Sequence, residues 1–396
     1  MLWNEYIRNI TSDPVRKREV QEKVMTLAHK DGNKISMKYG MKVIGESIED
    51  GYPLYIALHG GGQGDTPFIN DQQWEHMGIY YADSIKDGIY INPRGIRDTW
   101  DCHGNPESYY FYDRLITNMI AFENVNPNKV YLMGFSAGGD GVYMISPKMP
   151  DRFAAVHMSA GHPNGISLIN LFNTPIMLQV GMNDDAYGRN KVTAEYDQYL
   201  EELSNRSGNN YKYLRTPEYR HNCFIHIDKP HNFVDYGTHK QRVIADNSLW
   251  LKESKVTEKL SDTNAVRFLE QFTRNPLPFH VVWDLSCREK YRNGHNYYWL
   301  SAPDDYDSGI IDVTIDSEDN TIIVNENSFD GKYKSITSGF AVLVNETMLD
   351  IFRPVTIRYP DNTIRQVKIN YSEEVLKETM LSSGDYNYSF VSKIEI

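Results

Sequence analysis

A glycine-rich turn around Ser136 constrains the fold of this chain more than any other feature. Residues 130–145 read VYLMGFSAGGDGVYMI, so a strand-like apolar run ends at Gly134 and apolar character returns after Gly139. A plain loop would use Asn, Asp or Pro, and a buried strand would avoid so much glycine. Small residues around the serine suit a sharp turn from strand into helix, because a Cβ at Gly134 or Gly138 would clash there. The pattern G-x-S-x-G therefore predicts a strained, exposed Ser136, which is a candidate nucleophile.

The elements around that turn indicate an α/β fold. Short apolar runs predict strands at 54–58, 88–92, 129–133, 154–159, 175–180, 211–214 and 224–227. Helical patterns cover 109–123, 138–146 and 191–203. Strands that alternate with helices predict a mostly parallel sheet that is flanked by helices on both faces. Before these elements, residues 1–30 are expected to form a helical segment, with the helical pattern at 4–30, and residues 34–46 to form a hairpin.

The pattern of apolar and polar residues along the sequence changes near residue 273. A linker-like TRNPLP at 273–278 is followed by apolar and polar residues that alternate with period two, for example at 311–316. We therefore expect an α/β domain over 1–278 and a small, β-rich, sandwich-like domain over 279–396. The aromatic residues of the second domain either pack it together and against the first domain or form a face for sugars or a partner: Trp283, Tyr297, Tyr298 and Trp299.

The composition and charge of the chain limit which binding partners and which cellular compartment we expect. With 41 Lys and Arg against 53 Asp and Glu, the formal net charge of −12 repels phosphate backbones, so we expect no nucleic-acid partner. No apolar run reaches the length of a membrane span and the N-terminus lacks a signal-peptide core, so we expect a cytoplasmic protein without membrane contact. The three cysteines, Cys102, Cys223 and Cys287, lack C-x-x-C spacing and are expected to be reduced thiols. We expect no cofactor and no metal.

An activated serine needs hydrogen-bond donors for the oxyanion, and a second glycine run can supply them. The strand at 54–58 leads into LHGGGQG, residues 58–64, where glycines let a carbonyl approach the backbone closely. Gly61 and Gly62, together with Ala137 after the serine, are the candidate oxyanion-hole donors. A phosphate-binding loop is the alternative, but this run lacks the lysine of a Walker motif and the spacing of G-x-G-x-x-G.

The acid of the site is expected after a later strand, because the order in this kind of fold is Ser, Asp, His. Residues 177–185 read MLQVGMNDD, in which Gly181 lets the chain turn at the strand end. Asp184, three residues after that glycine, is the preferred acid. Asp185 is the alternative acid. If it is not the acid, it is expected to be a surface carboxylate or a helix-capping residue.

The base is expected after one further strand, where residues 219–233 read YRHNCFIHIDKPHNF. His226 lies inside a strand-like run, which favours a structural role. His231 follows Pro230 on a loop that could reach back to the serine, so His231 is the preferred general base. His221 and His226 remain alternatives.

Other polar and aromatic residues near these motifs have simpler interpretations. Asp140, four residues after the serine, is expected to complement the positive N-terminus of the following helix. Asp101 and His103 resemble a metal-ligand pair, but no second cluster completes a coordination set, so they are interpreted as rim residues. Weaker candidates for the wall of the substrate cleft are His59, Trp100 and Tyr110.

Four blocks together resemble α/β-hydrolase esterases of the polyhydroxybutyrate-depolymerase and feruloyl-esterase-like kind: LHGGG, GFSAGGDGVY, VGMNDDAYGRN and PHNFVD. The resemblance implies a catalytic triad of Ser136, Asp184 and His231 that cleaves carboxylic esters through an acyl-enzyme. The expected substrate is a small-molecule or carbohydrate-linked ester. The alternatives are a serine peptidase for short peptides and a non-catalytic binding protein with a hydrolase fold. The sequence does not indicate the number of subunits.

Overall fold

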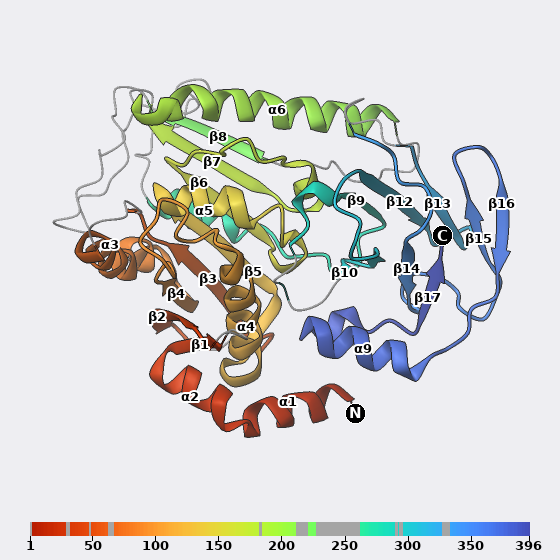
Figure 1. Ribbon diagram of the computed structural model, residues 1–396, viewed down its shortest axis with the longest axis horizontal. Helices are drawn as coiled ribbons and strands as arrows, with labels where there is room; N and C mark the ends of the chain where they lie inside the picture. Colours follow the sequence, from red (N-terminus) through yellow and green to blue (C-terminus); the bar gives the residue numbers. More distant parts are fainter. Residues whose placement is uncertain are drawn as a thin grey trace.

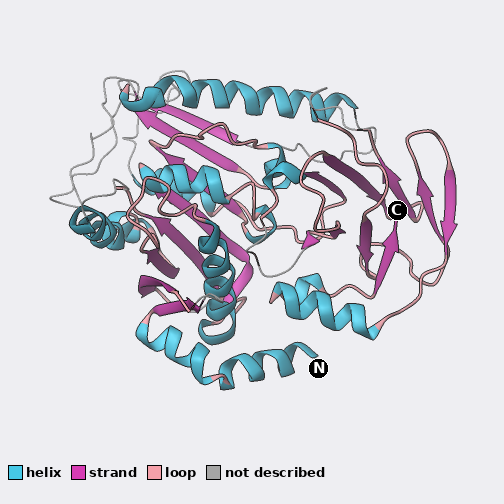
Figure 2. Ribbon diagram, in the orientation of Figure 1, coloured by secondary structure: helices cyan, strands magenta, loops and turns pink. Residues whose placement is uncertain are grey.

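The computed structural model describes most of the chain, as shown in Figure 1 and, by secondary structure, in Figure 2. The described residues are 2–28, 32–46, 49–61, 67–181, 184–210, 221–226, 262–289, 292, 296–326 and 333–396. The strand predicted at 211–214 lies outside them. Within these ranges, no helix is both long enough and apolar enough to cross a bilayer.

An eight-stranded mixed sheet forms the centre of the N-terminal part of the chain. Its strand order is β1-β2-β4-β3-β5-β6-β7-β8. The β1–β2 and β2–β4 pairs are antiparallel, whereas every pair from β4 to β8 is parallel. The strands are β1 (Val24–Ala28), β2 (Lys34–Ile44), β3 (Tyr52–Leu58), β4 (Gly88–Pro93), β5 (Val125–Phe135), β6 (Ala155–Ser159), β7 (Ile176–Gly181) and β8 (His221–His226). This mostly parallel sheet confirms the predicted fold class.

Helices cover both faces of the sheet, and strand β3 shows why (Figure 2). Successive side chains of a strand point to opposite faces, so Leu54, Ile56 and Leu58 enter one apolar core and Tyr55 and Ala57 enter another. The first core includes residues of α4, α5 and α6, and the second includes residues of α3 and α8. These helices are α3 (Pro67–Tyr80), α4 (Pro106–Glu123), α5 (Ala137–Ile145), α6 (Arg189–Asn210) and α8 (Asp262–Leu269).

The N-terminal segment differs from the prediction. Helix α1 (Leu2–Ser12) and helix α2 (Pro14–Glu22) are present, but the helix ends at Lys23, which adopts a left-handed conformation with φ 57°. Residues 24–28 then form β1, which pairs with the start of β2. The predicted hairpin within 34–46 is therefore wrong: β2 is one long strand, and its hairpin partner is β1. The other half of β2 pairs with β4, which ties this segment to the main sheet.

The C-terminal part contains two further sheets that enclose a third apolar core. One has the order β16-β15-β13-β12-β9, and the other has the order β10-β11-β14-β17. The strands are β9 (His280–Asp284), β10 (Asn296–Tyr297), β11 (Leu300–Ser301), β12 (Ile310–Asp316), β13 (Thr321–Val324), β14 (Ala341–Val344), β15 (Val355–Arg358), β16 (Ile364–Val367) and β17 (Ser392–Glu395). Short 3-10 helices complete the described chain: η1 (Ala82–Ser84), η2 (Pro150–Arg152), η3 (Ile169–Asn173), η4 (Ala186–Gly188), η6 (Leu285–Cys287) and η7 (Tyr386–Tyr388).

The C-terminal part also contains a helix that the sequence analysis did not predict, α9 (Glu373–Ser383). Its end signals are clear in the structure. Ser372 caps the first turn by accepting a hydrogen bond from the Val375 N–H, and Gly384 ends the helix in a left-handed conformation. Figure 1 shows α9 beside α1, so the C-terminal part also contacts the first helix of the chain.

The four aromatic residues that the sequence analysis considered in the C-terminal part pack inside the protein and do not form a binding face. Trp283, Tyr297, Tyr298 and Trp299 are all buried. The Trp299 indole N–H donates to the Pro278 carbonyl at 2.7 Å, and the Tyr297 hydroxyl donates to the Asn170 carbonyl at 2.8 Å. Of the two interpretations left open for these residues, the structure supports the packing role.

Polar contacts also join the two parts of the chain. Asn170 of η3 donates to the Asp284 carbonyl at 3.1 Å and accepts from the Asp284 N–H at 2.6 Å. The Arg292 guanidinium donates to both carboxylate oxygens of Asp151, at 2.7 and 2.8 Å. Both members of this ion pair are buried, and such bidentate pairs fix orientation as well as position.

Candidate active site

Ser136 lies between β5 and α5, on the strand-to-helix turn that its glycines predicted. Its backbone angles are φ 58° and ψ −121°, a conformation that costs energy for a residue with a side chain. A Cβ at Gly134 would lie 2.2 Å from the Gly138 carbonyl oxygen, and one at Gly138 would lie 2.1 Å from the Leu58 carbonyl oxygen. Both glycines are therefore required for the close approach of strand and helix. The predicted turn is confirmed.

The glycine loop after β3 lies directly beside this serine. A Cβ built on Gly60 would stand 3.3 Å from the Ser136 Cβ, so the two residues are in contact across the sheet edge. Gly61 has φ 105°, and a Cβ there would meet the Asn70 side chain at 2.4 Å. Gly61 and Ala137 thus lie on the two segments that flank Ser136, as an oxyanion hole requires. Gly62 lies outside the described residues.

His59 begins this loop, but it is not a cleft residue as predicted. Its side chain is fully buried, and both ring nitrogens are engaged within the protein. The Gly95 N–H donates to Nε2 at 3.0 Å, so the proton resides on Nδ1, which donates to the Gly60 carbonyl at 2.6 Å. His59 therefore connects the loops that follow β3 and β4, and it supports the glycine loop beside Ser136 from inside the protein.

The preferred acid occupies the expected place after β7. Asp184 is fully buried, whereas Asp185 is exposed and precedes the short helix η4. The Asp184 carboxylate lies 3.9 Å from Nη1 of Arg189, a buried arginine whose charge compensates that of the carboxylate. A buried, oriented carboxylate suits the role of fixing a histidine, so the burial favours Asp184 over Asp185.

The preferred base, His231, lies outside the described residues. Strand β8 is described, and it ends at His226, one of the two alternative histidines; the other, His221, begins the strand. Because β5, β7 and β8 run parallel, the chain leaves all three at the same edge of the sheet. The C-terminal end of β8, at His226, therefore lies at the same edge of the sheet as Ser136 and Asp184. The role of His231 stays a prediction.

The strand order, the helices on both faces and the serine turn between β5 and α5 together identify the fold. The chain has the α/β-hydrolase fold. In this fold the carboxyl edge of the parallel strands carries the reactive groups.

The known proteins to which this chain is similar include several esterases. No family model matches the chain. A stretch of 154 residues, 38% of the chain, is 28% identical to the bifunctional acetylxylan esterase/xylanase XynS20E of Neocallimastix patriciarum and spans only 22% of that protein. Among solved structures, the chain is similar to a thermostable esterase, with TM-score 0.38 and 15% identity over 63% of this chain and 62% of that one. It is also similar to LpqC, the poly(3-hydroxybutyrate) depolymerase from Bordetella parapertussis, with TM-score 0.42 and 14% identity over 59% and 92% of the two chains.

Two predicted residues of the cleft wall remain, Trp100 and Tyr110. One is exposed, and the other packs against a neighbouring side chain. Trp100, on the loop after β4, has half of its surface exposed and stays a candidate for the cleft wall. Tyr110 lies against Arg114 in α4, and Arg114 forms an ion pair with Glu19 of α2. Tyr110 therefore covers the contact between α4 and α2, and its predicted place in the cleft wall is wrong.

One buried group among the described residues has the spacing of a metal site. The ligand atoms of His59, Cys102 and His103 lie within 4.8 Å of one another. The predicted rim position of His103 is wrong, because the residue is fully buried; its Nε2 donates to the His59 carbonyl at 3.0 Å and its Nδ1 lies 3.3 Å from the Tyr112 hydroxyl.

The chemistry of this buried group does not favour a metal. All four ring nitrogens of the two histidines already have protein partners. Burial raises the pKa of the Cys102 thiol to about 12, and metals bind the thiolate. Burial also lowers the pKa of His103 to about 4. We interpret the group as a neutral hydrogen-bonded support for the loops around Ser136.

The sequence analysis missed the arginines that brace the loop carrying Trp100. Arg94 is buried and donates from Nε to Asp71 at 3.0 Å, and it also contacts Asp98. Arg97 donates to Glu107 of α4 at 2.8 Å. The signal was present, because PRGIRD places two arginines directly after β4, where a loop must be held at the sheet edge.

Proposed function

We propose that this chain is a serine hydrolase that cleaves carboxylic esters through an acyl-enzyme. The observation that carries the proposal is the position of Ser136. It occupies a strained turn at the carboxyl edge of the sheet, in contact with the glycine loop after β3. A loop or packing serine has no need of a positive φ, whereas a nucleophile on a sharp turn does. The esterase named as the curated relative supports the same reaction class.

The proposed mechanism assigns one role to each residue. The Ser136 Oγ attacks the ester carbonyl carbon while His231 takes the hydroxyl proton, and Asp184 holds the imidazole. The N–H groups of Gly61, Gly62 and Ala137 stabilise the negative charge on the carbonyl oxygen. As the tetrahedral intermediate collapses, His231 gives the proton to the departing alcohol. Water then attacks the acyl-enzyme with His231 again as base, which releases the carboxylic acid and restores Ser136.

A carbohydrate-linked ester is the substrate class that we propose. The curated relative is named as an acetylxylan esterase, and a sugar-linked ester is the substrate that this name states for it. In this chain the exposed indole of Trp100 stands on the loop after β4, where it could cover one face of a sugar ring or an aromatic acyl group.

A fluorophosphonate probe tests the nucleophile. Wild type is expected to be labelled and to hydrolyse p-nitrophenyl acetate, while Ser136→Ala loses both the label and the hydrolysis. Ser12→Ala, which removes an exposed serine of α1, is the matched control and should behave as wild type. Labelling that survives in Ser136→Ala would overturn the assignment. His231→Ala, compared with His221→Ala and His226→Ala, identifies the base, and a panel of ester and short-peptide substrates separates an esterase from a peptidase.

A further inference from the structure

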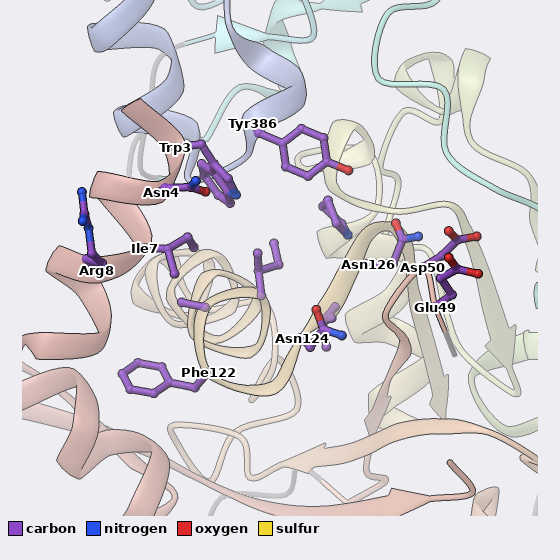
Figure 3. Close-up of a pocket in the computed structure, with 14 residues that line it drawn as sticks. Trp3, Asn4, Ile7, Arg8, Glu49, Asp50, Phe122, Asn124, Asn126 and Tyr386 are labelled. Atoms are coloured by element: carbon purple, nitrogen blue, oxygen red, sulfur yellow. The ribbon is translucent and has the colours of Figure 1, made fainter. Parts of the chain in front are cut away.

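A groove lies at the edge of the main sheet opposite to Ser136, between α1, the junction of α4 with β5, and η7. Its volume is about 1010 Å³. Figure 3 shows Trp3 and Tyr386 on one side of the groove and Asn124 and Asn126 on the other. Nothing in the proposed reaction uses this region, so the groove calls for an explanation of its own.

Two aromatic rings from opposite ends of the chain meet in this groove. The rings of Trp3 in α1 and Tyr386 in η7 have centroids 5.5 Å apart and an interplanar angle of 66°. Tyr386 is 44% exposed, so part of its ring is accessible from the groove. The edge-to-face arrangement leaves ring surface available at the groove.

Amides and a hydroxyl complete the lining. Among the described residues, no protein hydrogen bond engages the Trp3 indole N–H, the Tyr386 hydroxyl or the side-chain amides of Asn4 and Asn124. Each amide offers donors and an acceptor in one plane. The groove thus combines aromatic surface with several hydrogen-bonding groups that are not used within the described part of the protein.

The charged residues that line the groove limit which class of ligand we expect to bind there. Glu49 and Asp50 form part of the lining, against the single cation of Arg8, so the groove has a negative balance that disfavours phosphates and other anions. The number of amides and carboxylates disfavours an apolar ligand, because each would lose water without a partner. A sugar meets both requirements: its C–H face packs on an aromatic ring, and its hydroxyls pair with amides and carboxylates.

We propose that this groove is a second, non-catalytic binding site for a neutral oligosaccharide. Asn126 stands near the start of β5 and Ser136 directly after its end. Because the irregularity between Val125 and Val130 takes up about three residues, the two sites are separated by roughly 23 Å at about 3.3 Å per residue. The groove is therefore separate from the catalytic cleft. If the proposed esterase function holds, a bound polysaccharide would raise the local concentration of ester groups at Ser136. Sugar binding itself does not depend on that function.

Binding to unesterified sugars tests the proposal without any catalysis. The full-length protein is titrated calorimetrically with xylohexaose, cellohexaose and mannohexaose. At least one hexasaccharide is expected to bind to wild type and equally to Ser136→Ala. Tyr386→Ala and Asn4→Ala, which change exposed side chains, should weaken that binding at least tenfold. Tyr371→Ala, which changes an exposed aromatic residue of the C-terminal part outside the groove, is the matched control and should bind as wild type.

Two further measurements keep the outcomes distinct. Thermal melting of each variant shows whether it is folded; Trp3→Leu, which keeps apolar contact with the core, replaces any groove variant that fails this check. Hydrolysis of p-nitrophenyl acetate should be unchanged in Tyr386→Ala. Absence of binding to all three hexasaccharides, binding that survives Tyr386→Ala and Asn4→Ala, or binding lost in Tyr371→Ala would each overturn the proposal. None of these results bears on whether Ser136 is the nucleophile.

Discussion

Arg274 and Asp385 form a fully buried ion pair that joins the two parts of the chain. Nη2 of Arg274 lies 2.5 Å from Oδ2 of Asp385, and the same guanidinium donates to Asn128 and to the Asp151 carbonyl. Burial alone would raise the pKa of Asp385, but the charges of Arg274 and Arg152 and the hydrogen bonds from Arg274 and the Asn387 N–H together outweigh burial, and the pKa is lowered. The carboxylate is therefore charged in the folded protein, and the pair depends on both partners.

Asp385→Ala should destabilise the protein by about 3–5 kcal/mol, because it leaves the Arg274 charge buried without its partner. Urea unfolding measures the effect. Asp350→Ala is the matched control: Asp350 pairs with Arg353 at 2.6 Å on the exposed surface of the same C-terminal part, and its loss should leave the unfolding midpoint unchanged. Equal midpoints for the two variants would contradict this prediction.

A fragment that ends at Pro278 should be insoluble or should melt several degrees below the full chain. The cut removes Asp385, Arg292 and Asp284, and it exposes the buried surface around Asn170 and Asp151 to water. Exposed apolar and unpaired charged surface of this kind promotes aggregation. Size-exclusion chromatography and thermal melting provide the readout. A monodisperse fragment with the melting temperature of the full chain would show that the C-terminal part is an independent module.

Asp184→Asn should lower kcat for ester hydrolysis by on the order of 10⁴-fold, the loss typical when the orienting carboxylate of a triad becomes an amide. Asp185→Asn changes an exposed carboxylate one residue away and should keep kcat near that of wild type. The two variants are compared at saturating p-nitrophenyl acetate, with melting temperatures as a check on folding. If Asp185→Asn is the inactive variant, the acid is misassigned by one residue.

Stability should fall as the pH drops from about 6.5 toward 4. Burial lowers the pKa of His157 in β6 to about 4, whereas an unfolded imidazole titrates near pH ~6.5. Between these values the unfolded chain binds a proton that the folded chain does not, so the contribution is fully present above pH ~6.5 and is lost below it. His157→Leu should flatten the dependence of the unfolding free energy on pH by up to about 1.4 kcal/mol per pH unit.

The control for this pH dependence is His162, which is less deeply buried than His157 and whose side chain contacts Asn164. His162→Leu should leave the slope as in wild type. Because His157→Leu also removes a hydrogen bond with Gln179, its stability is expected to be lower at every pH, and only the slope is diagnostic. A wild-type slope in His157→Leu would mean that this imidazole is not the group responsible.

Strong local signals made the main sheet predictable from sequence. The run before Gly134 is continuous and apolar because β5 is buried on both faces. Glycine is required at Gly134 and Gly138 because a Cβ at either position would lie less than 3 Å from backbone atoms. Strand β1 was missed because five residues with one buried side chain, Met25, look like the continuation of a helix. Its existence depends on pairing with β2, which is tertiary information. Helix α9 had its signals, Ser372 and Gly384, and could have been recognised.

The candidate site was predictable in its order along the chain but less so in the surroundings of each residue. The turn at Ser136 and the position of Asp184 after β7 follow from motif and spacing, while the role of Asp184 as the acid stays a prediction. The burial of His59 does not, because it results from a backbone donor, the Gly95 N–H, that is 36 residues away and adjacent only in the fold. Tyr110 was misplaced for a similar reason: which face of α4 it occupies depends on α2 packing beside that helix.

The backbone at Ser136 has a consequence for the balance between folding and the proposed chemistry. A positive φ with a side chain costs of order 1–3 kcal/mol, which glycine at the same position would relieve. Ser136→Gly would therefore remove the hydroxyl group and relax the turn in one change. The proposed nucleophile thus stands where the backbone would be more relaxed without it.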